Sequence, residues 1–333
     1  YIKNILSKVY KYHMKILAVQ NRMGIGDTII FLPFIKALYK KFNTPISLLV
    51  RENSKADQYL YQTSYIDKIL LLEKDSKNNS RSVGITGIFN LIKEIKKYNF
   101  DKIFIFNSSL RFNLIARFSK IPEIYQYPLF SKTKQHIINV PKKFMKERLN
   151  LEVDEDPNIQ INNSLIINSI NKFKIDKNEL NILLGIGGSG PTKRIPAKTF
   201  LNVIDKISKI KKCKFFLATG KNSEEQLILN EILNSNFKNF CHRLDNFTIK
   251  EILPIIKCCD LSICNDTSFS HLSAALNIKT ITLMADTPLI YGNYNSKMFP
   301  IIPDGENTVG HNTLGKDKIN PEKIFNKFKE ILF

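Results

Sequence analysis

The stretch K-I-L-A-V-Q-N-R-M-G-I-G-D-T, residues 15–28, decides the expected fold. Its first six residues form a short apolar run that predicts a buried strand. Gly24 and Gly26 favour a tight loop over residues 21–27, because glycine adopts backbone conformations that other residues avoid. Apolar residues at helical spacing predict a helix from residue 28 to about residue 42. A strand, a glycine loop and a helix in this order are typical of a parallel β-α-β unit.

The same alternation continues along the chain. Before residue 145, similar patterns predict strands at residues 46–51, 66–72 and 102–106 and helices at 85–98 and 110–118. After residue 180, they predict strands at 181–185, 214–218, 261–264 and 280–284 and helices at 197–210, 223–233, 248–258, 268–276 and 321–332. Polar and charged residues dominate between 145 and 180, where we place a domain boundary. The chain is therefore predicted to be α/β with two parallel sheets, which bind ligands at the carboxyl ends of their strands.

Composition narrows the class of protein. The chain has 333 residues, of which 43% are hydrophobic, enough for two globular domains. The formal net charge of +20 attracts polyanions, although a general richness in lysine accounts for it equally well. No basic run with interleaved aromatic residues suggests a nucleic-acid interface, and nucleic acid is not an expected partner. No apolar stretch reaches the roughly 18 residues of a membrane span, which leaves peripheral contact with an anionic membrane open.

The first 13 residues form a separate segment. Ile2, Ile5, Leu6 and Val9 fall at helical spacing, with lysines between them. This pattern predicts a short basic amphipathic helix and not a signal peptide, because it lacks a continuous apolar region. Such a helix can lie on a membrane surface or pack on the first domain, and both interpretations stay open.

Metal and disulfide sites are not expected. The five cysteines, at 213, 241, 258, 259 and 264, contain no C-x-x-C pair and fit a reducing compartment. The D-E-D run at 154–156 has the spacing of a metal-binding D-x-D motif but follows no apolar strand. We interpret it as a solvated acidic run.

Three loops contain residue types that could carry chemistry. Asp27 in the first loop is either the cap of the following helix or a general base. The second loop, G-I-G-G-S-G-P-T-K-R-I-P at residues 185–196, matches a dinucleotide-binding fingerprint in its glycines. Pro191 and Pro196 delay the helix that this fingerprint requires, which argues against a dinucleotide site. The loop with Lys193 is then either a diphosphate-binding loop or a solvated turn with surface charges.

The third loop follows the strand at 261–264 and reads C-N-D-T-S-F-S-H-L-S-A-A-L over residues 264–276. Thr267, Ser268 and the start of the next helix offer hydroxyl and amide donors to an anion. The alternative is ordinary helix capping by Asp266 or Thr267, with His271 packed against the sheet.

These loops resemble those of the lipopolysaccharide heptosyltransferases, glycosyltransferase family nine. The resemblance rests on M-K-I at 14–16 with G-I-G-D at 24–27, on K-R-I-P at 193–196, on T-G-K-N-S-E-E at 219–225 and on the segment from N-D-T to A-D-T-P at 265–288. It spans residues 14–333. Two departures are Ser268 in place of the usual glycine and Ala285-Asp286 in place of glycine-proline, and both bear on the identity of the donor.

The resemblance implies a GT-B architecture, with two Rossmann-like domains whose parallel sheets face a central cleft. Residues 1–13 are then an extension, residues 14–170 the acceptor-binding domain and residues 171–333 the nucleotide-sugar-binding domain. Asp27 matches the catalytic base, and Lys193 matches the lysine that stabilises the departing diphosphate. The donor contacts that the resemblance implies are Gly26, Gly188, Ser189, Thr192, Glu224 or its neighbour Glu225, Phe247, Asp266, Thr267, Ser268 and His271.

The expected function is inverting, metal-independent transfer of a sugar, with heptose as the expected sugar and ADP as the expected carrier. No cofactor is expected besides this nucleotide-sugar donor. The acceptor would be a lipopolysaccharide core or related lipid-linked saccharide on the cytoplasmic face of the inner membrane. Two alternatives stay open, an NAD-dependent oxidoreductase that uses Gly185–Gly190 and a non-catalytic protein that binds sugar nucleotides.

Overall fold

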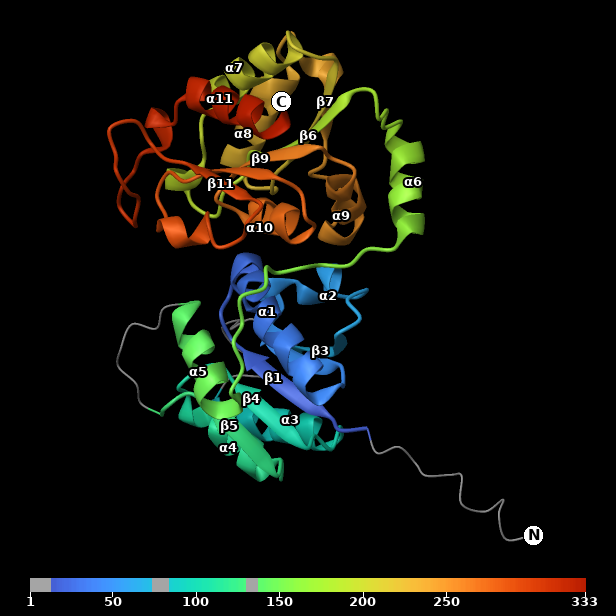
Figure 1. Cartoon of the computed structure of the whole chain (residues 1–333), viewed down its shortest axis with the longest axis vertical. Coiled ribbons are helices and arrows are strands. Elements are labelled where there is room, and N and C mark those ends of the chain that lie inside the picture. Colours follow the sequence, from blue (N-terminus) through green and yellow to red (C-terminus); the bar gives the residue numbers. More distant parts are fainter. Residues whose placement is uncertain (1–12, 74–83, 130–136) are drawn as a thin grey trace, which may run out of the picture. The chain divides into compact units, whose positions relative to one another are not determined.

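The computed structural model describes residues 13–73, 84–129 and 137–333 (Figure 1). Contacts divide the chain into two compact units. The first contains residues up to 23, 34–53 and 64–153, and the second contains residues 24–33, 54–63 and 154–333. The predicted amphipathic helix at the amino terminus lies outside the described residues.

The first unit is built on a five-stranded parallel sheet with the order β3-β2-β1-β4-β5. Its strands are β1 (Ile16–Gln20), β2 (Ile46–Arg51), β3 (Ile66–Leu72), β4 (Lys102–Ile105) and β5 (Glu123–Gln126). Its described helices are α3 (Gly84–Lys96), α4 (Leu110–Phe118) and α5 (Asn139–Leu149), together with the later part of α1 (Ile25–Phe42). Every residue of β1 is buried, as expected for a central strand that is covered on both faces.

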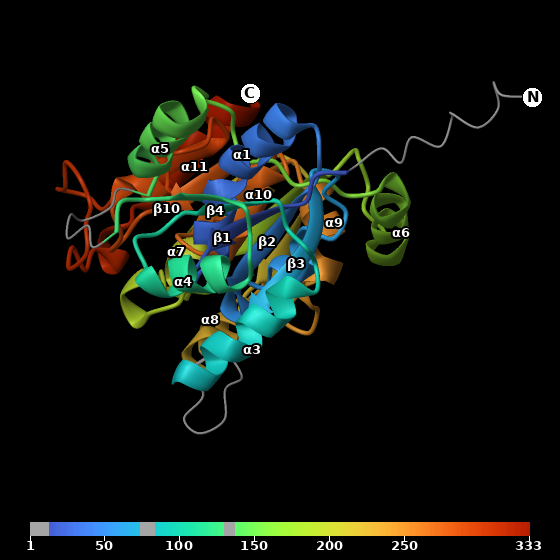
Figure 2. The same ribbon diagram turned by 90° about the horizontal axis from the view of Figure 1, so that it is seen from below.

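The helices α3 and α4 cover one face of this sheet (Figure 2). Leu91, Ile92 and Ile95 of α3 pack with Phe112 and Ile115 of α4 in one hydrophobic core, together with side chains of the strands. The two helices also pack against each other. This shared core fixes which side of each helix turns away from the sheet.

The second unit contains a six-stranded parallel sheet with the order β11-β10-β9-β6-β7-β8. Its strands are β6 (Leu180–Gly185), β7 (Cys213–Ala218), β8 (Cys241–Arg243), β9 (Leu261–Asn265), β10 (Thr280–Leu283) and β11 (Met298–Ile301). Its helices are α2 (Ala56–Tyr59), α6 (Asn163–Phe173), α7 (Ala197–Ser208), α8 (Ser223–Leu233), α9 (Ile249–Lys257), α10 (Ser268–Ala275) and α11 (Pro321–Leu332). The central strands β6 and β9 are fully buried. The predicted fold class, α/β with two parallel sheets, is confirmed.

Some elements differ from those that the sequence predicts. The helix α1 begins at Ile25, so the expected loop is shorter and Asp27 lies in the first helical turn. The edge strands β5 and β8 were not predicted, because they are short and lack a continuous apolar run. The edge strand β11 was missed as well; it is nonpolar, but it has only four residues and contains Pro300, which lacks the N–H that a strand donates. The polar region between 145 and 180 contains α6 and the end of α5, which their partly buried faces stabilise. No helix of the described residues combines the length and the apolar character needed to cross a membrane.

Candidate functional site

The carboxyl ends of β6 and β9 bring two of the predicted loops together in the second unit. The side-chain amide of Asn265, the last residue of β9, donates to the carbonyl oxygens of Ile186 and Gly187, both at 3.0 Å. Asn265 is fully buried, so these bonds fix the start of the glycine loop to the end of the neighbouring strand. The sequence analysis gave Asn265 no role, because no spacing rule connects it with a loop 78 residues earlier.

Lys193 and Asp266 form the ion pair at the centre of this region. The Lys193 ammonium lies 3.0 Å from the Asp266 carboxylate, which is buried. Burial alone would raise the pKa of Asp266, but its electrostatic interactions with the His271 imidazole and the Lys193 ammonium hold it below its ordinary value. Asp266 is therefore an anion at neutral pH, and it positions the lysine at the end of β9.

His271 lies on the other side of Asp266. Its Nε2 atom is 3.8 Å from an Asp266 carboxylate oxygen, and its Nδ1 atom is 2.8 Å from the hydroxyl of Tyr294, on which the imidazole stacks. Burial lowers the pKa of His271 against the opposing effects of the Asp266 and Asp27 carboxylates, so the ring is neutral at pH 7. The sequence gave no signal for Tyr294, which lies 23 residues further along the chain.

The first turn of α1 belongs to the same unit and contacts His271. A β-carbon added at Gly26 would lie 2.5 Å from the imidazole ring, so only glycine fits at this position. The sequence analysis considered Asp27 as the cap that precedes the helix, but α1 already begins at Ile25. Asp27 instead lies in the first turn, where its Oδ2 atom accepts the backbone N–H of Gly24 at 3.0 Å. The other carboxylate oxygen, Oδ1, forms no hydrogen bond within the described residues. Asp27 is half-buried and retains this oxygen for a second partner.

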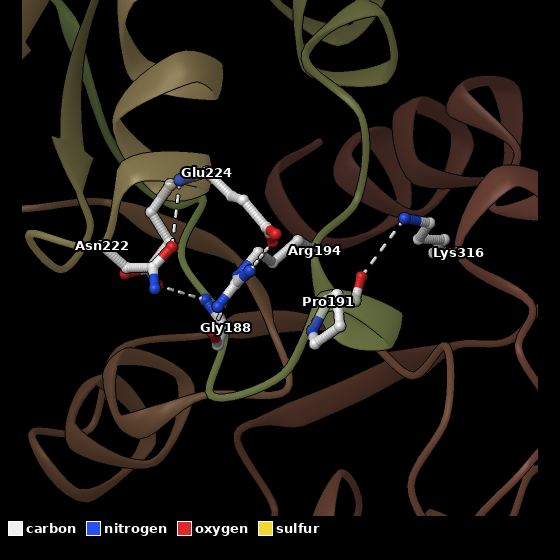
Figure 3. Close-up of polar contacts among 7 residues, drawn as sticks. Gly188, Pro191, Arg194, Asn222, Glu224 and Lys316 are labelled. Atoms are coloured by element: carbon white, nitrogen blue, oxygen red, sulfur yellow. Dashed lines mark hydrogen bonds and ion pairs between the residues drawn. The ribbon is translucent and has the colours of Figure 1, made fainter.

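The glycine loop after β6 is held at Gly188 from both sides (Figure 3). The Arg194 Nε atom donates to the Gly188 carbonyl at 3.0 Å, and its guanidinium also pairs with Glu224. The Gly188 N–H donates to Glu225 Oε1 at 2.7 Å. Glu224 caps no helix itself; its own N–H donates to the cap residue Asn222. The two neighbouring acids therefore differ, because Glu224 is exposed in an ion pair whereas Glu225 is buried against the loop.

The helix that a dinucleotide fingerprint requires is absent from this loop. Pro191–Lys193 form a single 3-10 turn, and α7 begins only at Ala197, after Pro196. Ser189 is exposed, and a β-carbon at Gly190 would meet no neighbouring atom. This geometry disfavours the oxidoreductase alternative and leaves open space beside the turn.

The start of α10 has donors without capping partners. Thr267 is the N-cap residue, but its side chain makes no capping hydrogen bond, and Asp266 is engaged with Lys193. The Thr267 Oγ1 atom is buried and has no hydrogen-bond partner within the described residues. Ser268, the first residue of the helix, is half-exposed. The capping alternative is thus not observed, and this helix terminus can bind an anion.

Asp286, one of the two departures from the family pattern, is bonded to backbone groups. Its carboxylate accepts the N–H of Leu314 at 2.9 Å. Burial raises its pKa, but the N–H groups of Leu314, Asn312 and Thr313 and the Thr192 hydroxyl outweigh this effect and lower it. Asp286 therefore joins the segment 312–314 to the turn that contains Thr192. Lys316 extends this connection by donating to the Pro191 carbonyl at 3.3 Å (Figure 3).

Phe247 lies apart from the ion pair, at the start of α9. Its ring packs edge-on against Phe173 of α6 at 5.6 Å, and the Lys172 ammonium lies 4.7 Å from its centre. No contact between the described side chains connects Phe247 with Lys193 or the glycine loop. Of the predicted residues, the structure thus brings together Gly26, Lys193, Asp266 and His271, whereas Ser189 and Phe247 lie at the margin.

The cysteines and the acidic run have structural surroundings. All five cysteines are free, and burial raises the pKa of Cys264 to about 12, which disfavours a reactive thiolate. Asp156 of the acidic run accepts the Ser296 hydroxyl at 2.6 Å, so this residue is not merely solvated as predicted. Within the described ranges, no group of His, Cys, Asp and Glu residues has an arrangement that could hold a metal ion.

Comparison with known proteins agrees with these motifs. A model of glycosyltransferase family 9 (heptosyltransferase) matches residues 88–308. The chain is 25% identical over 333 aligned residues to lipooligosaccharide heptosyltransferase 2 of Campylobacter jejuni subsp. jejuni serotype O:2, which covers 92% of this chain and 95% of that protein. It is 29% identical over 168 residues to lipopolysaccharide heptosyltransferase 1 of Campylobacter coli, and the match covers about half of each chain (48% and 49%).

Solved structures share the fold. The ADP-heptose lipopolysaccharide heptosyltransferase II of E. coli superimposes with a TM-score of 0.72 at 15% identity, covering 96% of this chain and 98% of that one. The family 9 glycosyltransferase of Veillonella parvula DSM 2008 gives 0.77 at 16% identity, with 96% and 97% covered. The match of the family model over residues 88–308, two thirds of the chain, establishes that the protein belongs to glycosyltransferase family 9, the heptosyltransferases.

Proposed function

We propose that this family member transfers heptose from ADP-heptose to the core of a lipopolysaccharide or lipooligosaccharide, with inversion at the anomeric carbon and without a metal ion. The observation that carries the proposal is Lys193, held 3.0 Å from buried Asp266 beside an uncapped helix start. A leaving diphosphate gathers negative charge, and a fixed cation with nearby amide donors stabilises it. The names of the Campylobacter relatives support heptose as the sugar.

The diphosphate would bind between the turn at Lys193 and the start of α10. The ammonium group contributes the positive charge, and the backbone N–H groups of Ser268 and Phe269 and the Thr267 hydroxyl contribute uncharged donors. Ser189 lies in the same loop as Lys193 and would add a hydroxyl group; Thr192 would add a second by turning its O–H from Asp286 to the phosphate. Asp266 would keep the ammonium in place, because moving Lys193 away would leave the buried Asp266 carboxylate without this positive partner.

Asp27 would act as the general base. Its free oxygen, Oδ1, would take the proton from an acceptor hydroxyl while that oxygen forms a bond to the anomeric carbon of the donor. The bond from the anomeric carbon to the phosphate oxygen breaks in the same step, and ADP leaves with the electron pair. The hydrogen bond from Gly24 holds the other oxygen and fixes the orientation of the carboxylate.

The nucleoside would lie toward α8 and α9. Glu224 is the proposed acceptor of the ribose hydroxyls, and its neighbour Glu225 keeps the loop in shape through the Gly188 N–H. Phe247 is the proposed adenine contact, with one flank of its ring already packed against Phe173. The acceptor would be a lipid-linked saccharide, so we also propose that the protein works on the cytoplasmic face of the inner membrane.

Calorimetric titration with ADP, UDP and GDP tests the donor, using the wild type, Lys193→Ala and Lys198→Ala. Lys198 is an exposed lysine just beyond the loop and serves as the matched control. We expect preference for ADP and a loss of roughly 10- to 100-fold in affinity for Lys193→Ala, the scale of one charge-assisted hydrogen bond. Unchanged ADP binding by Lys193→Ala would contradict the phosphate role, and a preference for UDP or GDP would contradict the ADP-linked donor.

A further inference from the structure

The outward face of α4 is apolar. Leu110, Leu114 and Phe118 are 41%, 36% and 61% exposed, and they occur at every fourth residue, which places them in one stripe along the helix. The core of the sheet contacts the opposite side, at Phe112 and Ile115. A helix on the surface of a soluble domain normally turns polar residues outward, so this stripe needs an explanation.

The neighbouring helix α3 extends the stripe into a patch. Phe89 is 66% exposed. The two helices run in the same direction over the same face of the sheet, and Asn113 of α4 bonds to Gln126 of β5 on the flank away from α3. Helical spacing of 100° per residue then places Phe89 and Phe118 on the flanks that face each other. We call Phe89, Leu110, Leu114 and Phe118 the α3/α4 apolar patch.

The charges beside this patch are positive. Lys93 and Lys96 follow Phe89 by four and seven residues and lie on the same flank of α3; neither forms an ion pair with a described residue. The helix α4 contains arginines and no acidic residue. The single acid of α3, Glu94, falls on the opposite flank of that helix. A partner that covers the patch therefore meets an apolar surface bordered by cations.

Exposure of an apolar residue does not by itself mark such a surface. Leu227 of α8 is 69% exposed, but it stands alone between Glu224 and Glu231 on its helix. An anionic partner would be repelled there. Leu227 of α8 is thus a natural control for the α3/α4 apolar patch, because it is an exposed leucine among acidic residues and not among basic ones.

We propose that the α3/α4 apolar patch docks the first unit on an anionic membrane surface. The phenylalanine and leucine side chains would enter the boundary between headgroups and acyl chains, and the basic side chains beside them would contact the phosphate groups. Docking on the membrane would bring the protein to the lipid-linked acceptor of the proposed function, and in that respect this proposal rests on the proposed function. Binding to lipid, however, can be measured without donor or acceptor.

Co-sedimentation with vesicles tests the proposal. We expect wild-type protein to bind vesicles of phosphatidylglycerol and phosphatidylcholine, to bind pure phosphatidylcholine far more weakly, and to lose affinity as salt is added. The double substitution Leu114→Ser and Phe118→Ser should weaken binding by at least about tenfold. Lys93→Gln and Lys96→Gln should weaken it about fivefold each, the scale of one basic residue at an anionic surface. Leu227→Ser is the control and should bind as the wild type does.

Failure has distinct outcomes. Absence of wild-type binding, binding that does not need the anionic lipid, or equal binding by all variants would overturn the membrane proposal. A dimer that dissociates in Leu114→Ser/Phe118→Ser, with vesicle binding unchanged, would assign the patch to a second copy of the chain. Titration with ADP and thermal unfolding of the same variants show that they are folded. Loss of ADP binding in Lys193→Ala with intact vesicle binding separates the two proposals.

Discussion

Two glycine loops follow buried parallel strands, one after β1 and one after β6, yet they use the same residue type differently. The first opens α1 at Ile25, and Asp27 bonds to the N–H of Gly24 only three residues earlier. The second is delayed by Pro191 and Pro196, and its Lys193 pairs with Asp266, 73 residues away. The contacts of the loop after β1 can thus be derived from its own sequence, whereas those of the loop after β6 depend on the order of the strands in the sheet.

The largest expected effect concerns the first loop. Asp27→Asn keeps an oxygen that can accept the Gly24 N–H, so the helix should still form, but the side chain can no longer take a proton. We expect the rate of heptose transfer to fall by about 10²- to 10⁴-fold, with ADP affinity unchanged. Transfer assays with ADP-heptose, together with calorimetry, measure the two quantities. Full activity of this variant would show that Asp27 only stabilises the start of α1, and the proposed general base would have to lie elsewhere.

The next effect compares one glycine from each loop. The β-carbon of Gly26→Ala would lie 2.5 Å from the His271 ring, whereas Gly190→Ala enters open space. Alanine is the better helix former, but the overlap with a buried imidazole should outweigh this gain, for a net loss of about 1–2 kcal/mol in the free energy of unfolding. Chemical denaturation should give Gly190→Ala the stability of the wild type. A Gly26→Ala protein as stable as the wild type would show that His271 can move away.

The smallest effect is a dependence on pH. The pKa of His271 in the folded protein lies below its ordinary value of 6.5, so the unfolded chain takes up the proton first as the pH falls. The free energy of unfolding should therefore decrease below about pH 6.5, by at most about 1.4 kcal/mol per pH unit from this residue. His271→Gln should show a shallower decrease when denatured at a series of pH values between 7.5 and 5.5. Equal slopes for the two proteins would argue against a buried neutral imidazole.

The sequence predicts the features that depend on local patterns and misses those that depend on long-range contacts. The strands with continuous apolar runs were predicted, and so were the loops at their carboxyl ends. The edge strands β5, β8 and β11 were missed, because pairing with a neighbour and not their own residues makes them strands. Lys193 and Asp266 were both expected at the site. Their pairing, and the bonds of Asn265, Tyr294 and Asp286, join residues or backbone groups whose proximity no local pattern encodes.

The bonds at the start of the glycine loop also have an electrostatic consequence. Three consecutive carbonyl groups, at Ile186, Gly187 and Gly188, accept hydrogen bonds from Asn265 and Arg194. Rotating any of these peptide planes would break a buried bond, so the orientation of each peptide dipole is fixed before a ligand arrives. An anion that binds here encounters a field already in place, and little of its binding free energy is lost in reorganising the backbone. The rigidity of this loop thus fixes the local electric field as well as the backbone conformation.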